Sequence, residues 1–383
     1  MRAAVYNLYW STFGGGEQVA AGIAELLLAR GYEVVLFGPE PVDHQATRER
    51  LGRHLNGADW QRITDDEEAA AASEGFDLFV NCTYLSSARA RSGRSLYYVH
   101  FPGVPRTSRQ QLISTASRIG HRALNVLPSL PGPLAGVRDG FARRIVDTSW
   151  VRTYTVVAAN SRFTAEWVDR LWGVPATVVY PPVATTVIGG EKGPSIIAIG
   201  RFFDRRFGHC KKQDVLLDTW LDWKDHGISD GWNLRMLGGA DGASRDYVLD
   251  LRRRAIGTTA SVEVNVARSV IESALSSAAI FWHAGGYGED PNVHPDRFEH
   301  FGIAVVEAMA AGCVPVVYAA AGPAEIVRHG IDGFHWSTID ELRAHTQQLI
   351  DDSALRQQMA MAAIERAAEY SNEAFRERLA ALM

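Results

Sequence analysis

The chain has 383 residues, of which 46% are hydrophobic and 22% are charged, and its formal net charge at pH 7 is −5. This composition excludes a disordered chain, and the length is too great for one ordinary hydrophobic core, so we expect two domains. The three cysteines (Cys82, Cys210 and Cys313) are widely spaced and odd in number, which argues against a disulfide framework and against a zinc site. No signal segment precedes the first strand, and no apolar run approaches the roughly 18 residues of a membrane span, so we predict a cytoplasmic protein.

Strand-like and helix-like segments alternate from the N-terminus, which is typical of parallel sheets built from βα units. The first strand, 3–8, leads through a glycine-rich turn into a helix from about 17 to 30, which Gly31 ends. A further helix is expected near 162–171. The other strand candidates of this half are 33–37, 77–81, 96–100, 155–159 and 176–180.

Gly14, Gly15 and Gly16 lie between the first strand and its helix. Glycines allow a ligand to approach the backbone closely, and a helix N-terminus favours phosphate. A dinucleotide fingerprint would need a third glycine where Val19 stands. The three glycines therefore predict either an anion-binding loop or a structural tight turn.

The stretch 87–152 is strongly basic, with eleven arginines against Asp139 and Asp147. Such a stretch can bind anionic lipid, phosphate or nucleic acid, but it can equally form a solvated surface paired with distant acids. It lacks the interleaved aromatic residues of a single-strand binder, so we expect no nucleic-acid partner. Peripheral contact with a membrane and an ordinary charged surface stay open as alternatives.

The second half begins after Pro181 and Pro182, where the glycine-rich segment 185–193 predicts a linker. The alternating pattern then restarts, and the last segment, 354–383, is helical. We therefore predict two doubly wound parallel sheets, with the site in the cleft at the carboxyl ends of their strands. The expected elements are 195–199, 213–223, 233–237, 245–254, 261–266 and 279–283.

Two cationic residues follow the first strand of the second half. Arg201 comes directly after Gly200, and Lys211 with Lys212 opens the next helix. An arginine and a lysine that converge at a strand end can neutralise a leaving diphosphate without a metal. Surface lysines at a helix start would give the same pattern.

Residues 299–312 combine two carboxylates with a loop and a helix. Glu299 precedes Phe301, Gly302 and Ile303, and Glu307 lies about one turn inside the apolar helix that follows. Free backbone N–H groups and the helix dipole favour an anion at such a helix start, and a carboxylate suits sugar hydroxyls. The segment thus predicts a nucleotide-sugar site, although carboxylates also occur in first turns simply because the dipole stabilises them.

This segment resembles the E-x7-E motif of retaining GT-B glycosyltransferases of family four, as in glycogen-synthase-like and mannosyltransferase enzymes. The resemblance covers the whole chain in motif order and is strongest from 200 to 336. It implies an acceptor-side domain (1–182), a nucleotide-sugar domain (183–367) and a final helix (about 368–383) that packs back on the first domain.

The resemblance also implies roles for single residues. Glu299 would contact the donor sugar. The amides of the Phe301-Gly302-Ile303 segment would bind the phosphates, and Glu307 would bind the ribose hydroxyls. Arg201 and Lys211 would hold the diphosphate, with Lys212 as the second choice because the loop 202–210 is longer than usual. Gly15 and Gly16 would face the donor and the acceptor. His100 lies in a Tyr-Val-His-Phe-Pro segment similar to one in mannosyltransferases of lipid-linked oligosaccharides, where the histidine lies near the transferred sugar.

The activity implied is retaining transfer of a hexose, with a mannose-like sugar favoured. The donor would be a nucleoside diphosphate sugar and the acceptor a glycan, lipid-linked or small molecule. No metal or other cofactor is expected, and the chain contains no Asp-x-Asp motif. The alternatives are a sugar-nucleotide epimerase or phosphorylase on the same fold, and a non-catalytic partner subunit that binds the nucleotide sugar.

Overall fold

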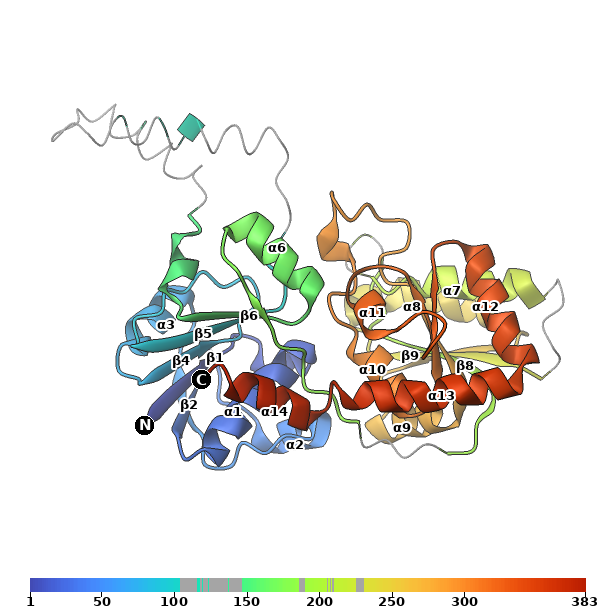
Figure 1. Cartoon of the computed structure of the whole chain (residues 1–383), viewed down its shortest axis with the longest axis horizontal. Helices are drawn as coiled ribbons and strands as arrows, with labels where there is room; N and C mark the ends of the chain where they lie inside the picture. Colours follow the sequence, from blue (N-terminus) through green and yellow to red (C-terminus); the bar gives the residue numbers. More distant parts are fainter. Residues whose placement is uncertain are drawn as a thin grey trace.

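The computed structural model describes residues 1–103, 116, 117, 119, 123, 137, 147–185, 190–204, 206, 208, 210–224 and 231–383. Within these residues the chain forms two parallel sheets (Figure 1). Each sheet has helices on both faces, so the predicted fold class of two doubly wound domains is confirmed.

The N-terminal sheet has seven parallel strands in the order β3-β2-β1-β4-β5-β6-β7. Its strands are β1 (Arg2–Tyr6), β2 (Glu33–Gly38), β3 (Asp59–Arg62), β4 (Leu78–Asn81), β5 (Arg94–Val99), β6 (Val156–Ala159) and β7 (Thr177–Val178). The helices in the described residues of this half are α1 (Gly15–Ala29), α2 (His44–Leu51), α3 (Asp66–Ser73) and α6 (Arg162–Trp172).

The C-terminal sheet has six parallel strands in the order β10-β9-β8-β11-β12-β13. Its strands are β8 (Gly193–Ile199), β9 (Asn233–Gly238), β10 (Ala260–Val264), β11 (Ala278–His283), β12 (Val314–Tyr318) and β13 (Phe334–Trp336). The helices that follow them are α7 (Gln213–Lys224), α8 (Arg245–Ala255), α9 (Arg268–Ser277), α10 (Ile303–Ala310), α11 (Ala321–Ile326), α12 (Ile339–Asp351) and α13 (Ser353–Ala368).

Successive side chains of the central strands enter different core layers, because side chains alternate between the faces of a sheet. In β1, Ala3 and Val5 pack with residues of α1, whereas Ala4 and Tyr6 pack in the opposite layer with residues of α6. Each sheet is thus buried on both faces, which explains why its central strands are continuous apolar runs instead of alternating ones.

The last helix, α14 (Asn372–Ala380), leaves the C-terminal domain and lies beside α1 (Figure 1). Phe375 and Leu379 are buried in the core of the N-terminal domain. An isolated β-bridge pairs Val183, where the chain passes into the C-terminal domain, with Ser371, where it returns to the N-terminal domain. The domains are therefore joined by two adjacent segments.

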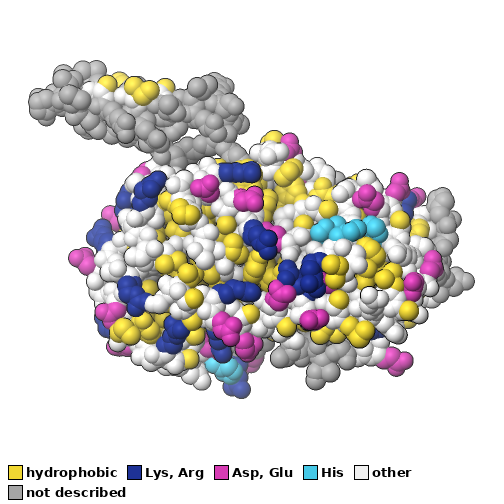
Figure 2. Space-filling model, viewed as in Figure 1, with side chains coloured by type: hydrophobic (Ala, Val, Ile, Leu, Met, Phe, Trp, Pro, Cys, Tyr) yellow, Lys and Arg dark blue, Asp and Glu magenta, His cyan; other side chains and the backbone are white. Residues whose placement is uncertain are grey.

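The basic stretch is only partly described. Seven of its arginines (106, 109, 118, 122, 138, 143 and 144) lie outside the described residues. Arg89 pairs with Asp147 at 2.7 Å. On the face shown in Figure 2, the Lys and Arg side chains drawn in blue lie interspersed with Asp and Glu. No helix in the described part of the chain is long and apolar enough to cross a membrane, and membrane contact stays a prediction.

Candidate functional site

A cleft of about 890 Å³ opens between the two domains, and both contribute to its walls. Most of its lining residues follow the carboxyl ends of strands, where a doubly wound fold places its ligands. The N-terminal domain contributes the glycine-rich turn after β1 and His100 after β5. The C-terminal domain contributes Arg201 after β8, Lys211, Asn265 after β10, His283 of β11 and 299–305.

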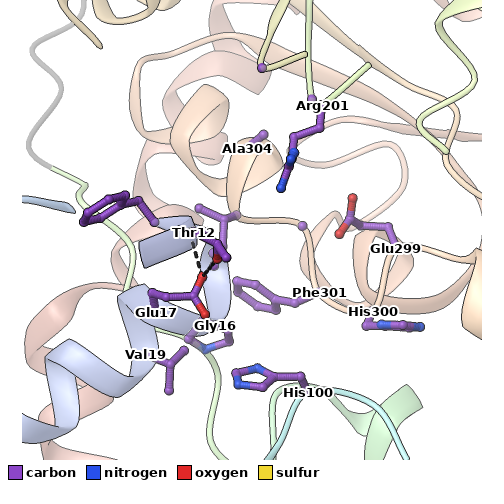
Figure 3. A pocket seen from close by; sticks show the side chains of 18 of the residues that line it. Thr12, Gly16, Glu17, Val19, His100, Arg201, Glu299, His300, Phe301 and Ala304 are labelled. Carbon is purple, nitrogen blue, oxygen red and sulfur yellow. Dashed lines mark hydrogen bonds between the residues drawn. The ribbon is translucent and has the colours of Figure 1, made fainter. Parts of the chain in front are cut away.

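The N-terminus of α1 is capped by the carboxylate of Glu17, which lies in the first turn of the same helix. Glu17 accepts hydrogen bonds from the amide of Gly14 at 2.8 Å and from Thr12 Oγ1 at 2.6 Å (Figure 3). Asn7 Nδ2 donates to the other carboxylate oxygen at 3.2 Å. An acid in the first turn stabilises the helix dipole, so this carboxylate fixes the glycine-rich turn in place.

Gly15 and Gly16 lie where the two domains meet. A Cβ on Gly15 would lie 2.9 Å from Ile303 Cδ1 of α10, and a Cβ on Gly16 would lie 3.3 Å from His100 Nε2. The small size of both glycines thus lets Ile303 and His100 pack closely around the cleft. This finding agrees with the structural role that sequence analysis left open, and the predicted ligand contact of the two residues stays a prediction.

His100 follows β5 on the N-terminal side of the cleft. Its Nε2 lies 3.0 Å from the carbonyl oxygen of Cys82, and its own carbonyl accepts from Asn160 Nδ2 at 2.9 Å. Because a carbonyl can only accept, Nε2 carries the proton and Nδ1 of the neutral ring is an acceptor. Burial lowers the pKa of His100, against the opposing effect of the Glu17 carboxylate.

Arg201 and Glu299 extend into the same space from the C-terminal domain (Figure 3). Lys211 Nζ donates a hydrogen bond to Glu299 Oε2. Arg201 is half-exposed, and its Nη2 lies 3.9 Å from Asp241 Oδ2. The arrangement places two cations and one carboxylate on one wall, which suits a ligand that carries both negative charge and hydroxyl groups.

The structure separates the two adjacent lysines. Lys211 lines the cleft, and its stem packs against Gly200, where a Cβ would lie 2.7 Å from Lys211 Cγ. Lys212 points elsewhere: it is 4% exposed and its Nζ lies 2.5 Å from Glu289 Oε1. Burial would raise the pKa of Glu289, but the ion pairs with Lys212 and Arg297 lower it. Lys212 is therefore engaged in a structural ion pair outside the lining of the cleft.

The 299–303 loop adopts the predicted position at a helix N-terminus. Gly302 has φ +113°, a conformation that glycine adopts readily, and α10 begins at Ile303. The Phe301 ring is buried against Tyr180 and Tyr370, with centroids 5.7 and 5.6 Å apart. These contacts hold the backbone of Phe301 and Gly302 at the cleft.

Glu307, the predicted ribose ligand, is not among the residues that line the cleft. It is 7% exposed, and its Oε1 accepts a hydrogen bond of 2.7 Å from Arg268 Nη2 at the start of α9. A ribose would have to compete with this arginine for the carboxylate. The ribose role of Glu307 stays a prediction that the observed packing does not favour.

An aromatic stack crosses the cleft beside the predicted site residues. The imidazole of His300 lies parallel to the Phe101 ring, with centroids 3.9 Å apart and an interplanar angle of 2°. Phe163 of α6 stacks on Phe101 at 5.9 Å. Since His300 follows Glu299 and Phe101 follows His100, the stack joins the two halves of the site.

Sequence reasoning missed several residues of the cleft. It assigned no role to Asn265, His283 or His300. Asn265 and His283 lie at the carboxyl ends of β10 and β11 and His300 lies in the loop before α10, and these positions were the available signal. Among the described residues, no group of three or more His, Cys, Asp or Glu side chains is placed to hold a metal ion.

Comparison with known families finds a match that lies in the C-terminal half of the chain. The family model for glycosyl transferases group 1 matches residues 192–366. The chain is 25% identical over 351 residues to human alpha-1,3/1,6-mannosyltransferase ALG2, which covers 80% of this chain and 73% of that protein. It is 27% identical over 215 residues to a GDP-Man:Man(3)GlcNAc(2)-PP-Dol alpha-1,2-mannosyltransferase of Dictyostelium discoideum, which covers 51% of this chain and 40% of that protein. A Neurospora crassa protein of the same name is matched over 48% of its length, so the chain spans less than half of these two relatives.

Solved structures resemble the whole chain. Sucrose-phosphate synthase from Thermosynechococcus elongatus superposes with a TM-score of 0.68 at 15% identity, covering 100% of this chain and 98% of that one. HepE from Anabaena, in complex with UDP, superposes with a TM-score of 0.67 at 16% identity, covering 99% and 98%. At these identities the likeness establishes a shared fold of two facing α/β domains.

Proposed function

We propose that the protein transfers a sugar from a nucleoside diphosphate donor, because residues 192–366 match the family model for glycosyl transferases group 1 and the whole chain has the two-domain GT-B fold. The acceptor is a glycan, lipid-linked or small molecule, and the anomeric configuration is retained. One observation carries the proposal: Arg201, Lys211, Glu299 and the start of α10 face His100 and the start of α1 across a single cleft.

The charges on the C-terminal wall suit the donor. Departure of the nucleoside diphosphate leaves negative charge on its terminal phosphate, and preorganised cations and amides stabilise such charge best. Arg201, Lys211 and the amides of Phe301 and Gly302 would supply this stabilisation without a metal. Glu299, which shares a hydrogen bond with Lys211, would orient the sugar hydroxyls.

Retention follows from attack on the face from which the diphosphate leaves. The bond between the anomeric carbon and the phosphate oxygen breaks, and a bond from the acceptor oxygen forms on the same face. The acceptor's proton passes to the departing phosphate oxygen. This course needs no protein nucleophile.

The N-terminal wall suits an acceptor with sugar rings. Tyr9 and Tyr84 line the cleft and are 43% and 41% exposed, and the Arg50 guanidinium lies 4.8 Å from the Phe13 ring centroid. Exposed aromatic side chains offer an apolar face with a polar edge, as sugar rings do. The names of the matched relatives favour a mannose-like donor sugar.

The proposal is tested by incubating the chain with GDP-mannose, UDP-glucose or ADP-glucose and a set of sugar acceptors, in EDTA and in magnesium. We expect acceptor-dependent release of one nucleoside diphosphate in EDTA, with an α-linked product by NMR. An isomerised donor would identify an epimerase, and a free sugar phosphate formed from inorganic phosphate would identify a phosphorylase. No turnover together with tight nucleotide-sugar binding would identify a non-catalytic subunit.

A further inference from the structure

His283 ends β11 at the C-terminal wall of the cleft. The residue is only 6% exposed, although its ring lines the cavity. Its carbonyl oxygen accepts a hydrogen bond of 3.2 Å from the Trp336 indole of β13, so the backbone at this position is fixed by the neighbouring strands.

Both ring nitrogens of His283 lack a hydrogen-bond partner among the described residues. Buried polar atoms are nearly always paired, because an unpaired one loses its hydrogen bonds to water and gains nothing in return. An imidazole with two unpaired nitrogens at the wall of a cavity therefore indicates a partner that enters through the cavity.

The space beside the ring is kept open by a glycine. A Cβ on Gly285 would lie 3.0 Å from His283 Nε2 and 3.1 Å from Cε1. The same Cβ would lie 3.6 Å from Glu299 Cβ. Any larger residue at this position would press on the imidazole and contact the Glu299 side chain at its Cβ.

Glu299 defines what the partner must be. Its Oε2 lies 3.6 Å from His283 Nε2, just beyond hydrogen-bonding distance, and already accepts from Lys211. A group that bonds to both the imidazole and the carboxylate must donate to the carboxylate, and it must donate to or accept from the imidazole according to the ring's tautomer. A hydroxyl does both, whereas a phosphate oxygen only accepts and would be repelled by Glu299.

We propose that His283 binds a hydroxyl of the donor's sugar, beside the hydroxyl held by Glu299, and so determines which sugars the site accepts. This inference rests on the proposed function. A site that hydrogen-bonds a substrate hydroxyl discriminates strongly against analogues that lack it, because the protein group is then left unpaired. His283 thereby selects the sugar on the same wall of the cleft where Arg201 and Lys211 would bind the diphosphate.

The test compares binding of a nucleoside diphosphate with binding of its sugar conjugate by calorimetry, using GDP with GDP-mannose and UDP with UDP-glucose. For His283→Ala we expect unchanged affinity for the diphosphate and roughly tenfold weaker binding of the conjugate, the effect of one hydrogen bond to a buried group. His283→Gln, which keeps a side-chain donor and acceptor, should recover part of the loss. His345→Ala removes an imidazole from α12, outside the lining of the cleft, and should change neither affinity.

Monodeoxy donors identify the hydroxyl without relying on the variant alone. In the unaltered protein, one deoxy analogue should bind about tenfold more weakly than the donor that carries all its hydroxyls. In His283→Ala, the same analogue and the complete donor should bind with equal affinity, because the partner of the missing hydroxyl is already gone. The role of His283 would be overturned if His283→Ala lost affinity equally for the diphosphate and for its sugar conjugate. It would also be overturned if every deoxy donor lost as much affinity in His283→Ala as in the unaltered protein. If the unaltered protein binds neither the diphosphates nor their conjugates, the proposed function fails, and this inference with it.

Discussion

Lys211 and Lys212 are neighbours with different surroundings, and this difference predicts opposite effects of substitution. Lys211→Ala removes a cation from the cleft, so we expect kcat/KM for transfer to fall by about a hundredfold. Stability should change little, because the Lys211 side chain is partly exposed. Steady-state kinetics and denaturant unfolding of the same preparation check both statements.

Lys212→Ala is the matched control. It leaves Glu289 in a largely buried position without its lysine, although Arg297 stays 3.0 Å away. Breaking a buried pair in this way lowers the free energy of unfolding by about 3 kcal/mol. A loss of transfer in Lys212→Ala with full stability would reverse the roles of the two lysines.

Sequence alone could not separate these residues. Both lysines follow a loop of unusual length, so the pattern does not fix which of them faces the cleft. At a helix start, neighbouring residues point in different directions, and here one side chain lines the cleft while the next is buried in the domain. For Glu307, the pattern located the helix and the turn correctly. It could not reveal Arg268, which is distant in sequence and reaches the carboxylate from α9.

At the scale of elements, the ends of β8 and β9 approach so closely that only glycine fits. A Cβ on Gly238 would lie 1.9 Å from the carbonyl oxygen of Gly200, directly before Arg201. We expect Gly238→Ala to lower the free energy of unfolding by roughly 3 kcal/mol, because backbone must move. Denaturant unfolding measures the change.

Gly242→Ala provides the comparison, since a Cβ there would meet nothing within 4 Å. Its effect should stay within about 0.5 kcal/mol. Equal effects of the two substitutions would show that the strand ends are less tightly packed than described.

Three of the elements that sequence analysis missed bury few large side chains. They are α2, β3 and α3, which lie at or near the edge of the N-terminal sheet. All four residues of β3 are exposed, and the eight residues of α2 contain one buried side chain. Without a buried face there is no hydrophobic period to read, whereas the central strands are apolar throughout and were located closely.

For the whole molecule, Glu325 is a direct link between the domains. This residue of α11 accepts hydrogen bonds from the amides of Phe163 at 2.6 Å and Arg162 at 2.9 Å, at the start of α6 in the N-terminal domain. Burial raises the pKa of Glu325, although these two amides oppose the shift. Together with the stack of Phe101 on His300, the carboxylate connects the two domains beside the cleft.

We expect Glu325→Ala to lower the free energy of unfolding by about 1 kcal/mol, as loss of a helix cap does, and to increase the radius of gyration measured by X-ray scattering. Ser161→Ala removes the cap that α6 receives within its own domain, in which Thr164 N donates to Ser161 Oγ at 3.0 Å. It should destabilise the protein to a similar extent without changing the radius of gyration. An unchanged radius in both variants would show that Glu325 does not hold the domains together.

The account depends most directly on the cleft being a site for a nucleoside diphosphate. The decisive measurement is thermal unfolding with GDP, UDP and ADP, each in EDTA and in magnesium, because a ligand that binds only the folded state raises the melting temperature. We predict that one of the three raises Tm in EDTA and that Lys211→Ala reduces this shift. No shift with any nucleotide in either condition would contradict the account.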